Sequence, residues 1–484
     1  MELCEDYTEN GKRVDALLRV EESFDLIKKE LTVGGRSAVF YYPDGMVDGD
    51  AMEKLMIYLL SLKPDAWTGV PGTQAFADAF VRAHLPFIET EVVSDPDGMV
   101  RSVLSGVTLM LADGLGKYAI LIDARTYPGR SVEEPQTDRV MLGARDGFVE
   151  TLIFNTALIR RRVRDPALTV RHVTVGSVSR TDTAICYLQG RADDAYVRRL
   201  TERLEALPAK SLTAGHESLA ELLIPDRWYN PFPKIRYTER PDTAAAQLLE
   251  GNVLILCDNS PVAMVLPTSV FDFLQETNDF YLPPLTGTYI RLLRHLIFWS
   301  TLFLTPLWFL FVRNPDLTPA FLRFTLPGEP GKLPILWQLL LVELIIDGLR
   351  MASMNTPDML SNSLSVVGGL ILGDFAVGLG WLIPEVIVFM AFVAISNFTQ
   401  RSYQLGYAFK FLRIGLLLLV HFLGAPGFVL GCIGIFLLLV TNRTVDGRHS
   451  YLYPLIPFDG RALLSLFLRL KKTTKPKKSV WGKE

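Results

Sequence analysis

Residues His295–Val312 read HLIFWSTLFLTPLWFLFV, an 18-residue stretch without a formal charge. Arg291 and Arg294 stand shortly before it. A stretch of this length and composition is typical of a membrane-spanning helix, and basic residues at its start favour a cytoplasmic entry. The 146 residues from 295 to 440 hold only 14 of the chain's 101 charged side chains. Residue 295 therefore marks the point where a water-soluble N-terminal part of the chain gives way to a membrane part.

Further apolar segments follow this first one, at residues 333–349, 364–383, 386–398 and 414–440. The last segment contains Gly424-Ala425-Pro426-Gly427, and so is either one broken helix or two helices that borrow a turn from their flanks. A hairpin at this break gives six spans and places Arg401, Lys410 and Arg413 in a cytoplasmic loop. Four spans with a re-entrant piece is the alternative. We expect an all-α polytopic membrane domain of about six helices over residues 286–445.

The two ends of the chain indicate its orientation. Residues 461–484 hold eight basic residues and one acidic residue, which favours a cytoplasmic C-terminus. The first thirty residues are rich in charge and contain no apolar stretch of signal-peptide length, so the N-terminus is expected on the same side. Residues 446–484 are expected to form a basic tail that contacts anionic lipid, with a merely solubilising tail as the alternative.

Overall composition excludes several classes of protein. With 49 Lys+Arg against 52 Asp+Glu, the net charge of −3 is too near neutral for a general nucleic-acid binder. The four cysteines are scattered and are expected to be buried or idle thiols, not disulfides or metal ligands. There is no phosphate-loop spacing, no Gly-x-Ser-x-Gly and no helical pair of histidines. We therefore expect no enzyme, no cofactor and no metal site.

The water-soluble part alternates short β-branched or apolar runs with helical patterns. We expect two α/β lobes, residues 1–130 and 131–285, in which the polar segment 130–140 is a connector. The expected strands are residues 37–42, 106–111, 118–123, 170–178, 183–189, 253–257 and 262–266. The expected helices are residues 52–62, 73–84, 146–163 and 193–207. Residues 114–124 and 250–260 share a turn, strand and Asp, which convergence explains as well as duplication does.

Acidic side chains inside the membrane segments are the sharpest functional signal. Glu343 and Asp347 lie four residues apart and share one helix face, with Arg350 three residues further on. Acids cannot face lipid at low cost, so we expect them to point to a bundle interior, a partner or water. They either pair with Arg350 or line a cation pathway, for which Asp374 in the next span is a further candidate.

Two other patterns have a structural and a functional interpretation. The glycines around Asp374, which are Gly368, Gly369 and Gly373, are expected to allow close packing of helices. Arg160-Arg161-Arg162 closes an apolar helical stretch. It is expected to be a helix C-terminus whose arginines are solvated or paired with acids, with an anion site or a lipid contact as the alternative.

Several motifs occur in one order along the chain: Glu134-Pro135, Gly147-Phe148-x-Glu150, Thr238-Glu239-Arg240-Pro241-Asp242, Asp258-x-Ser260-Pro261 and Ser365–Gly373. On these motifs, from about residue 100 to 460, the chain resembles the A subunits of the GerA-type spore germinant receptors of endospore-forming bacteria. Residues Asn355–Leu360, NTPDML, resemble the stage V sporulation protein AF branch. They stand where the receptors have a different motif, which puts direct nutrient sensing in doubt.

The resemblance implies a two-lobed cytoplasmic domain and a membrane domain in the inner membrane of the spore. It also implies a homo-oligomeric ring whose spans line an ion path, a small membrane partner subunit and other germination proteins as partners. We therefore expect a subunit of a gated cation channel that promotes ion or dipicolinate release during germination. A non-conducting scaffold that organises receptor subunits is the alternative.

Overall fold

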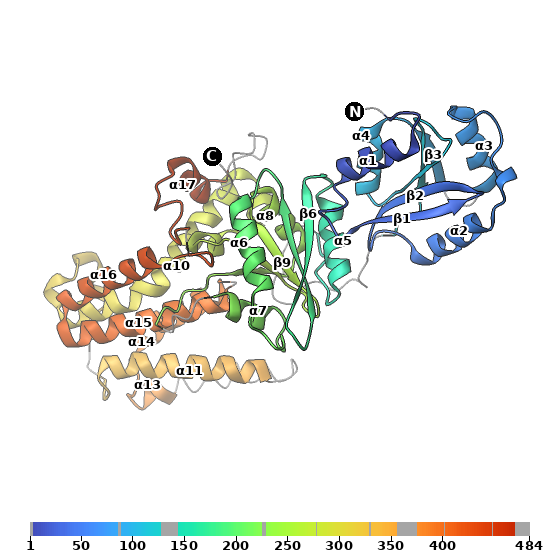
Figure 1. The fold of residues 1–484 in the computed structure, drawn as a ribbon. Coiled ribbons are helices and arrows are strands. Elements are labelled where there is room, and N and C mark those ends of the chain that lie inside the picture. Colours follow the sequence, from blue (N-terminus) through green and yellow to red (C-terminus); the bar gives the residue numbers. More distant parts are fainter. Residues whose placement is uncertain are drawn as a thin grey trace. The chain divides into compact units, whose positions relative to one another are not determined.

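The computed structural model describes residues 3–85, 89–126, 144–224, 229–276, 278–328, 331–355, 375–400, 402–447 and 449–469. The chain divides into two compact units. The first contains the described residues of Met1–Pro225 and Ile235–Thr268, and the second contains those of Asp226–Lys234 and Ser269–Lys471. The first unit is built of sheets and helices and the second of helices (Figure 1).

The first unit contains two lobes, as the sequence predicts. In chain order, the first lobe holds α1 (Tyr7–Leu18), β1 (Leu26–Val33), β2 (Arg36–Pro43), α2 (Gly49–Ser61), α3 (Gln74–His84), β3 (Glu89–Val93), α4 (Pro96–Leu104), β4 (Thr108–Ala112) and β5 (Ala119–Asp123). Its strands form one antiparallel sheet in the order β1-β2-β4-β5-β3.

Helices cover both faces of this sheet because its central strands are apolar on both sides. Along β2, Val39 and Tyr41 belong to the core that α1 and α4 share with the sheet. Ala38 and Phe40, which point the other way, belong to the core under α2 and α3. The lobe therefore has three layers, and the sheet is the middle one.

The second lobe repeats this order of elements. It holds α5 (Leu152–Arg162), β6 (Leu168–Val175), β7 (Thr181–Leu188), α6 (Asp194–Glu205), α7 (His216–Leu223), β8 (Arg236–Thr238), α8 (Pro241–Leu249), β9 (Val253–Cys257) and β10 (Ala263–Leu266). The sheet order β6-β7-β9-β10-β8 is that of the first lobe, strand for strand. The similar segments 114–124 and 250–260 contain β5 and β9, which are not equivalent strands, so the shared topology does not come from that similarity.

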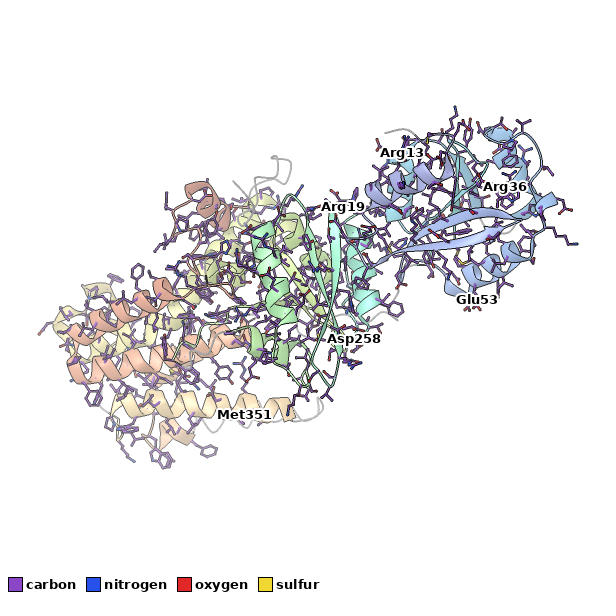
Figure 2. The ribbon with its side chains drawn as sticks, viewed as in Figure 1. Arg13, Arg19, Arg36, Glu53, Asp258 and Met351 are labelled. Atoms are coloured by element: carbon purple, nitrogen blue, oxygen red, sulfur yellow. The ribbon has the colours of Figure 1, made fainter. Side chains whose placement is uncertain are left out.

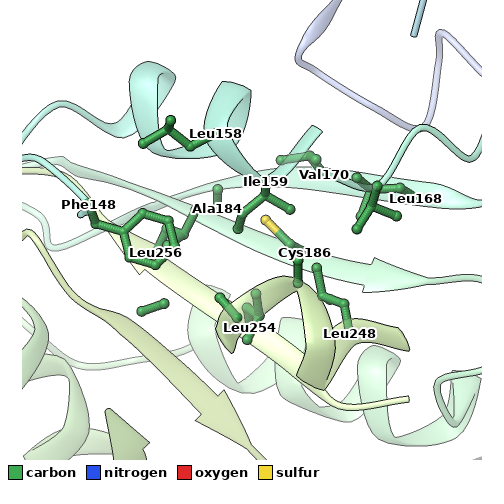
Figure 3. Close-up of a cluster of buried hydrophobic side chains, with 14 of the residues drawn as sticks. Phe148, Leu158, Ile159, Leu168, Val170, Ala184, Cys186, Leu248, Leu254 and Leu256 are labelled. Carbon is green, nitrogen blue, oxygen red and sulfur yellow. The ribbon is translucent and has the colours of Figure 1, made fainter. Parts of the chain in front are cut away.

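A continuous apolar core joins α5 and α8 to one face of the second sheet. Figure 3 shows Leu158 and Ile159 of α5 above Cys186 of β7, with Leu248 of α8 and Leu254 of β9 below. Cys186 is fully buried, and this burial raises the pKa of its thiol. The thiol is therefore a core side chain, as the sequence predicts for the scattered cysteines.

The second unit is helical in its described part. Its elements are η2 (Val270–Leu274), α9 (Asn278–Tyr281), α10 (Pro284–Arg313), η3 (Pro315–Leu317), η4 (Ala320–Thr325), α11 (Ile335–Asn355), α13 (Ala376–Gly378), α14 (Pro384–Phe398), α15 (Tyr403–Leu423), α16 (Ala425–Thr441) and α17 (Gly460–Phe467). Of these helices, α10 and α15 are long and apolar enough to cross a membrane, while α14 and α16 are apolar but shorter. The number of spans stays a prediction.

The break at Gly424 separates two helices that form a tight hairpin. Gly424 takes a positive φ of 65° and caps α15 and α16 at once. The helix α15 begins at Tyr403, eleven residues before the predicted apolar segment 414–440. It therefore includes Lys410 and Arg413. The predicted cytoplasmic loop at these two residues is therefore wrong, since an apolar helix continues through them.

We expect Gly427→Ala to destabilise this hairpin. A Cβ at Gly427 would lie 2.1 Å from the backbone oxygen of Leu419, an atom that cannot move aside cheaply. The expected loss is about 1–3 kcal/mol, measured as thermal unfolding of the full chain in detergent. Gly434, on the same helix, has open space and is the matched control: Gly434→Ala should be neutral or stabilising. Equal effects of the two substitutions would contradict the close packing.

Candidate functional site

Two ion pairs join α11 to α15 inside the helical unit. Arg413 Nε lies 2.8 Å from Glu343 Oε1, and Nη2 of the same guanidinium pairs with that oxygen too. One turn further along α11, Asp347 Oδ2 pairs with Lys410 Nζ. Residue numbers rise along α11 while they fall along α15, so the two helices run antiparallel where the pairs form.

Arg350 adds a third level to this contact. Its guanidinium carbon lies 4.2 Å from the ring centroid of Tyr403 and 5.5 Å from that of Tyr407, within cation–π range. Figure 2 labels Met351, the next residue along α11. The charge ladder, as we name this contact, has the levels Glu343–Arg413, Asp347–Lys410 and Arg350–Tyr403/Tyr407.

The two ion pairs of the charge ladder differ in exposure. The side chains of Glu343 and Arg413 are 6% and 0% exposed, whereas those of Asp347 and Lys410 are 28% and 11% exposed. Burial of a charge is tolerated when the charge is paired and hydrogen-bonded. Glu343 and Arg413 therefore depend on each other, while Asp347 is accessible from outside the unit.

Arg413 also binds a third helix. Its Nη1 donates a hydrogen bond of 2.7 Å to the backbone carbonyl of Thr301 on α10. Pro306 lies inside α10 and has no N–H, so the hydrogen-bond pattern of the helix is interrupted close to this level. One buried guanidinium thus connects α10, α11 and α15.

The Glu343–Arg413 level of the charge ladder lies at mid-length of α15. Arg413 is eleven residues after the N-cap Ser402 and ten before Leu423. At 1.5 Å per residue, each end of the helix is about 15 Å away. This distance is half the thickness of a hydrocarbon core of about 30 Å, so the level corresponds to the centre of a bilayer that α15 would cross.

The structure assigns partners to the acids that differ from those the sequence predicts. Glu343 is buried, in line with the expectation that the acids avoid lipid. The predicted pairing with Arg350 is corrected, because the acids bind Arg413 and Lys410 while the Arg350 guanidinium lies over two tyrosine rings. Two signals could have placed Lys410 and Arg413 on one face of a helix, though not opposite the acids: their three-residue spacing and the N-cap residue Ser402 before them.

Several predicted site residues lie outside the described residues, and their roles stay predictions. These are Asp374, Gly368, Gly369, Gly373, Glu134 and Pro135, together with the tail beyond residue 469. Among the residues that the structure does describe, no group of three His, Cys, Asp or Glu could hold a metal ion.

The motif around Glu150 lies at the start of α5 in the second lobe. The Asp258 carboxylate accepts a hydrogen bond of 3.1 Å from the Leu152 N–H, at the first residue of α5. The N–H of Asn259 donates to the Glu150 carbonyl at 2.8 Å. Because the chain is held here by the turn after β9, the helix begins at Leu152, six residues later than the sequence predicts. Figure 2 labels Asp258.

The second motif, around Arg240, forms the start of α8. The Arg240 side chain is fully buried, and its Nε donates to Asp242 Oδ1 at 3.0 Å. Pro241 is the first residue of α8, where a missing N–H costs nothing. The Glu239 carbonyl accepts a hydrogen bond of 2.8 Å from the Phe148 N–H. The motif residues of the second lobe therefore connect the start of α5 with the start of α8.

His216 and Ser260 form a hydrogen bond beside this motif. His216 Nδ1 bonds to Ser260 Oγ, and the His216 ring lies edge-on to Tyr237 at 5.3 Å. Burial lowers the pKa of His216, so the ring is held neutral. Since Ser260 is only 2% exposed, its hydroxyl is closed to solvent and the pair contributes to the core of the lobe.

Comparison with known proteins gives a consistent result. Residues 16–480 match the family described as Bacillus/Clostridium GerA spore germination protein. The chain is 37% identical to stage V sporulation protein AF of Bacillus subtilis (strain 168) over 93% of this chain and 90% of that protein. It is 28% identical to spore germination protein A1 of the same organism, over 95% and 93% of the two chains.

A solved structure is also similar to the chain. The crystal structure of the N-terminal domain of the A subunit of the Bacillus megaterium spore germinant receptor GerK3 matches with a TM-score of 0.41 and 21% identity. The match covers 55% of this chain and 96% of that domain.

Proposed function

The chain belongs to the Bacillus/Clostridium GerA family of spore germination proteins, and from this premise we propose that it is a subunit of a membrane complex that conducts cations during germination. We propose an oligomer of this chain in the inner membrane of the spore, with both termini cytoplasmic and no enzymatic step. A small membrane subunit, other germination proteins and anionic lipid at the C-terminal tail are its proposed partners. The ion path is expected to serve release of ions or dipicolinate.

The observation that supports the proposal is the charge ladder. Two acids of α11 meet two basic side chains of α15, and the Glu343–Arg413 pair lies midway along a helix of spanning length. Intramembrane acids commonly mark ion paths. In the described arrangement Lys410 and Arg413 occupy the sites that a permeating cation would use, so this arrangement is the closed one. Movement of α11 away from α15 would free the acids.

Lys410→Gln is expected to raise cation flux. The Asp347–Lys410 pair is part-exposed and worth at most about 1 kcal/mol, so its loss should raise flux about fivefold. The measurement is cation flux in liposomes that contain the full chain and its co-expressed membrane partner. Lys410→Arg keeps the charge pair and is the matched control, and Asp347→Asn should lower flux or change cation selectivity.

A non-conducting scaffold is the second candidate, and one observation favours it. The Glu343–Arg413 pair is dry and bound to α10 through Thr301, as a purely structural connection would be. In that case none of the variants conducts, although each forms the oligomer of the parental chain. Absence of flux from intact oligomers that include the partner would therefore replace the channel proposal by the scaffold.

A further inference from the structure

Five helix ends meet at one side of the helical unit. Arg313, the last residue of α10, donates to the Val420 carbonyl near the end of α15 at 2.8 Å. Lys332, shortly before α11, donates its N–H to the carbonyl of Gly380, shortly before α14, at 3.0 Å. Since α16 begins directly after α15, its start lies at this side as well.

The ends of α10 and α15 lie at the same level along the helix axes as the starts of α11 and α14. The ring of Trp308, near the end of α10, lies on that of Phe389, near the start of α14, with centroids 4.7 Å apart. From Arg294 to Arg313 is 19 residues, or about 28 Å along the helix. The level is therefore one hydrocarbon thickness away from the paired charges of Arg294 and Asp279, which mark the opposite side of the unit.

Large aromatic side chains point outward at this level. We name them the aromatic rim: Phe321, Phe324, Trp337, Trp381 and Phe422, all of them exposed. Phe321 and Phe324 are the most exposed of them, at 74% and 83%, together with Phe422 at 77%. Such exposure is costly in water, so a group of exposed aromatic side chains at one level marks a contact with an apolar phase.

The two phenylalanines are held outward by an ordered turn. They lie on η4, where residues three apart share a side of the 3₁₀-helix. The turn is fixed because Trp308 Nε1 donates to the carbonyl of Thr325, its last residue, at 3.0 Å. Arg323, between the phenylalanines, is exposed, and so is Lys332. The surface thus combines aromatic rings with cations.

We infer that the aromatic rim is a lipid-headgroup contact, in which Phe321 and Phe324 insert below the phosphates while Arg323 and Lys332 bind phosphate oxygens. The inference rests on the proposed location of the helical unit in a membrane. Aromatic side chains gather at the level of the headgroups, and basic residues add attraction to anionic lipid. The end of α10 and the turn η4 therefore fix the depth of the unit in the bilayer.

Depth-dependent fluorescence tests this contact. Single cysteines at Phe324, at Ile433 in the middle of α16 and at Val178 in the first unit are labelled with NBD, in a full chain whose part-exposed Cys4 and Cys432 are replaced by Ala. The Ile433 probe reports membrane insertion, and the Val178 probe, at a 75% exposed position, reports water. The protein is reconstituted in phosphatidylcholine vesicles, with and without phosphatidylglycerol.

The expected result is that NBD at position 324 is quenched by a spin label high on the acyl chain and protected from iodide. Phosphatidylglycerol should place the probe at position 324 deeper in the bilayer, and Arg323→Gln/Lys332→Gln should abolish this effect. If position 324 is quenched by iodide while position 433 is in lipid, the rim inference is overturned and the membrane assignment stands. Protection from both quenchers at 324 would overturn it in favour of a protein contact. Iodide quenching at 433 as well would overturn the membrane assignment itself.

Discussion

Glu343→Gln should lower the free energy of unfolding of the helical unit by about 3 kcal/mol. The substitution leaves the fully buried guanidinium of Arg413 without its counter-charge, and loss of one partner of a buried pair costs about 3–5 kcal/mol in soluble proteins. The remaining bond of Arg413 to the Thr301 carbonyl compensates part of this loss. Thermal unfolding of the full chain in detergent, followed by tryptophan fluorescence, measures the effect.

Two variants control for this interpretation. Glu343→Gln/Arg413→Gln removes both charges and should recover most of the lost stability, because no unpaired charge remains. Asp347→Asn changes the equivalent acid one turn away, whose pair is part-exposed, and should cost about 1 kcal/mol or less. If Glu343→Gln and Asp347→Asn cost the same, the difference in burial has no energetic meaning and the charge ladder is not anchored at Glu343.

These variants also separate the two proposed functions. In a channel, the neutral double variant should assemble but conduct less, because the acid that attracts cations is gone. In a scaffold, the single variant should lose assembly and the double variant should regain it. In a channel, flux therefore falls in the double variant although its stability recovers, whereas a scaffold shows no flux and its assembly follows its stability.

The two-lobed fold follows from the sequence wherever an element lies in the core. Residues 37–42 and 118–123 are apolar on consecutive positions, so they are predicted as strands and are found as β2 and β5. The strand β1, LIKKELTV, was not predicted because it lies at the edge of its sheet and its middle consists of three consecutive exposed charged residues, Lys28, Lys29 and Glu30. Edge strands carry a weak apolar signal, and their presence is decided by pairing with a neighbour, here β2.

Of the two ion pairs in the candidate site, the sequence predicts the acids but not their basic partners. The two acids stand out in the sequence because they are the only charged residues of the apolar segment 333–349. Lys410 and Arg413 lie among apolar residues too, but a rule for loops assigned them to the cytoplasm. The rule fails here because the acids of α11 neutralise these cations inside the helical unit. Pairing between segments 60 to 70 residues apart cannot be derived from one sequence.

The same limit applies to Arg160. Its sequence context, three arginines at the end of a helix, indicates a solvated helix terminus or pairs with acids. In the structure Arg160 and Asp25 are 0% and 2% exposed and joined by two hydrogen bonds of 2.9 Å. Asp25 belongs to the first lobe and Arg160 to the second, so the pair connects the two lobes of the first unit.

Neighbouring contacts make this connection a small network. Ser23 Oγ accepts a hydrogen bond from the Val170 N–H at 3.0 Å, and the Phe24 N–H donates to the Val170 carbonyl at 3.1 Å. Arg160 Nη2 also reaches Ser23 Oγ at 3.3 Å. The segment before β1 is thus held on β6 by the Phe24 N–H and the Ser23 hydroxyl, and the buried Arg160–Asp25 pair adds a contact with α5.

Arg160→Met should therefore destabilise the first unit by about 3–5 kcal/mol, because the Asp25 carboxylate is then buried without a counter-charge. Arg162→Gln is the matched control. Arg162 lies on the same helix, but it and its partner Asp146 are 21% and 31% exposed, so loss of this pair should cost less than about 1 kcal/mol of stability. Hydrogen exchange of β1 and β6 in the full chain measures the effect, and Arg160→Met/Asp25→Leu should restore protection. Unchanged exchange in Arg160→Met would mean that the hydrogen bonds of the Ser23 hydroxyl and the Phe24 N–H hold the lobes together by themselves.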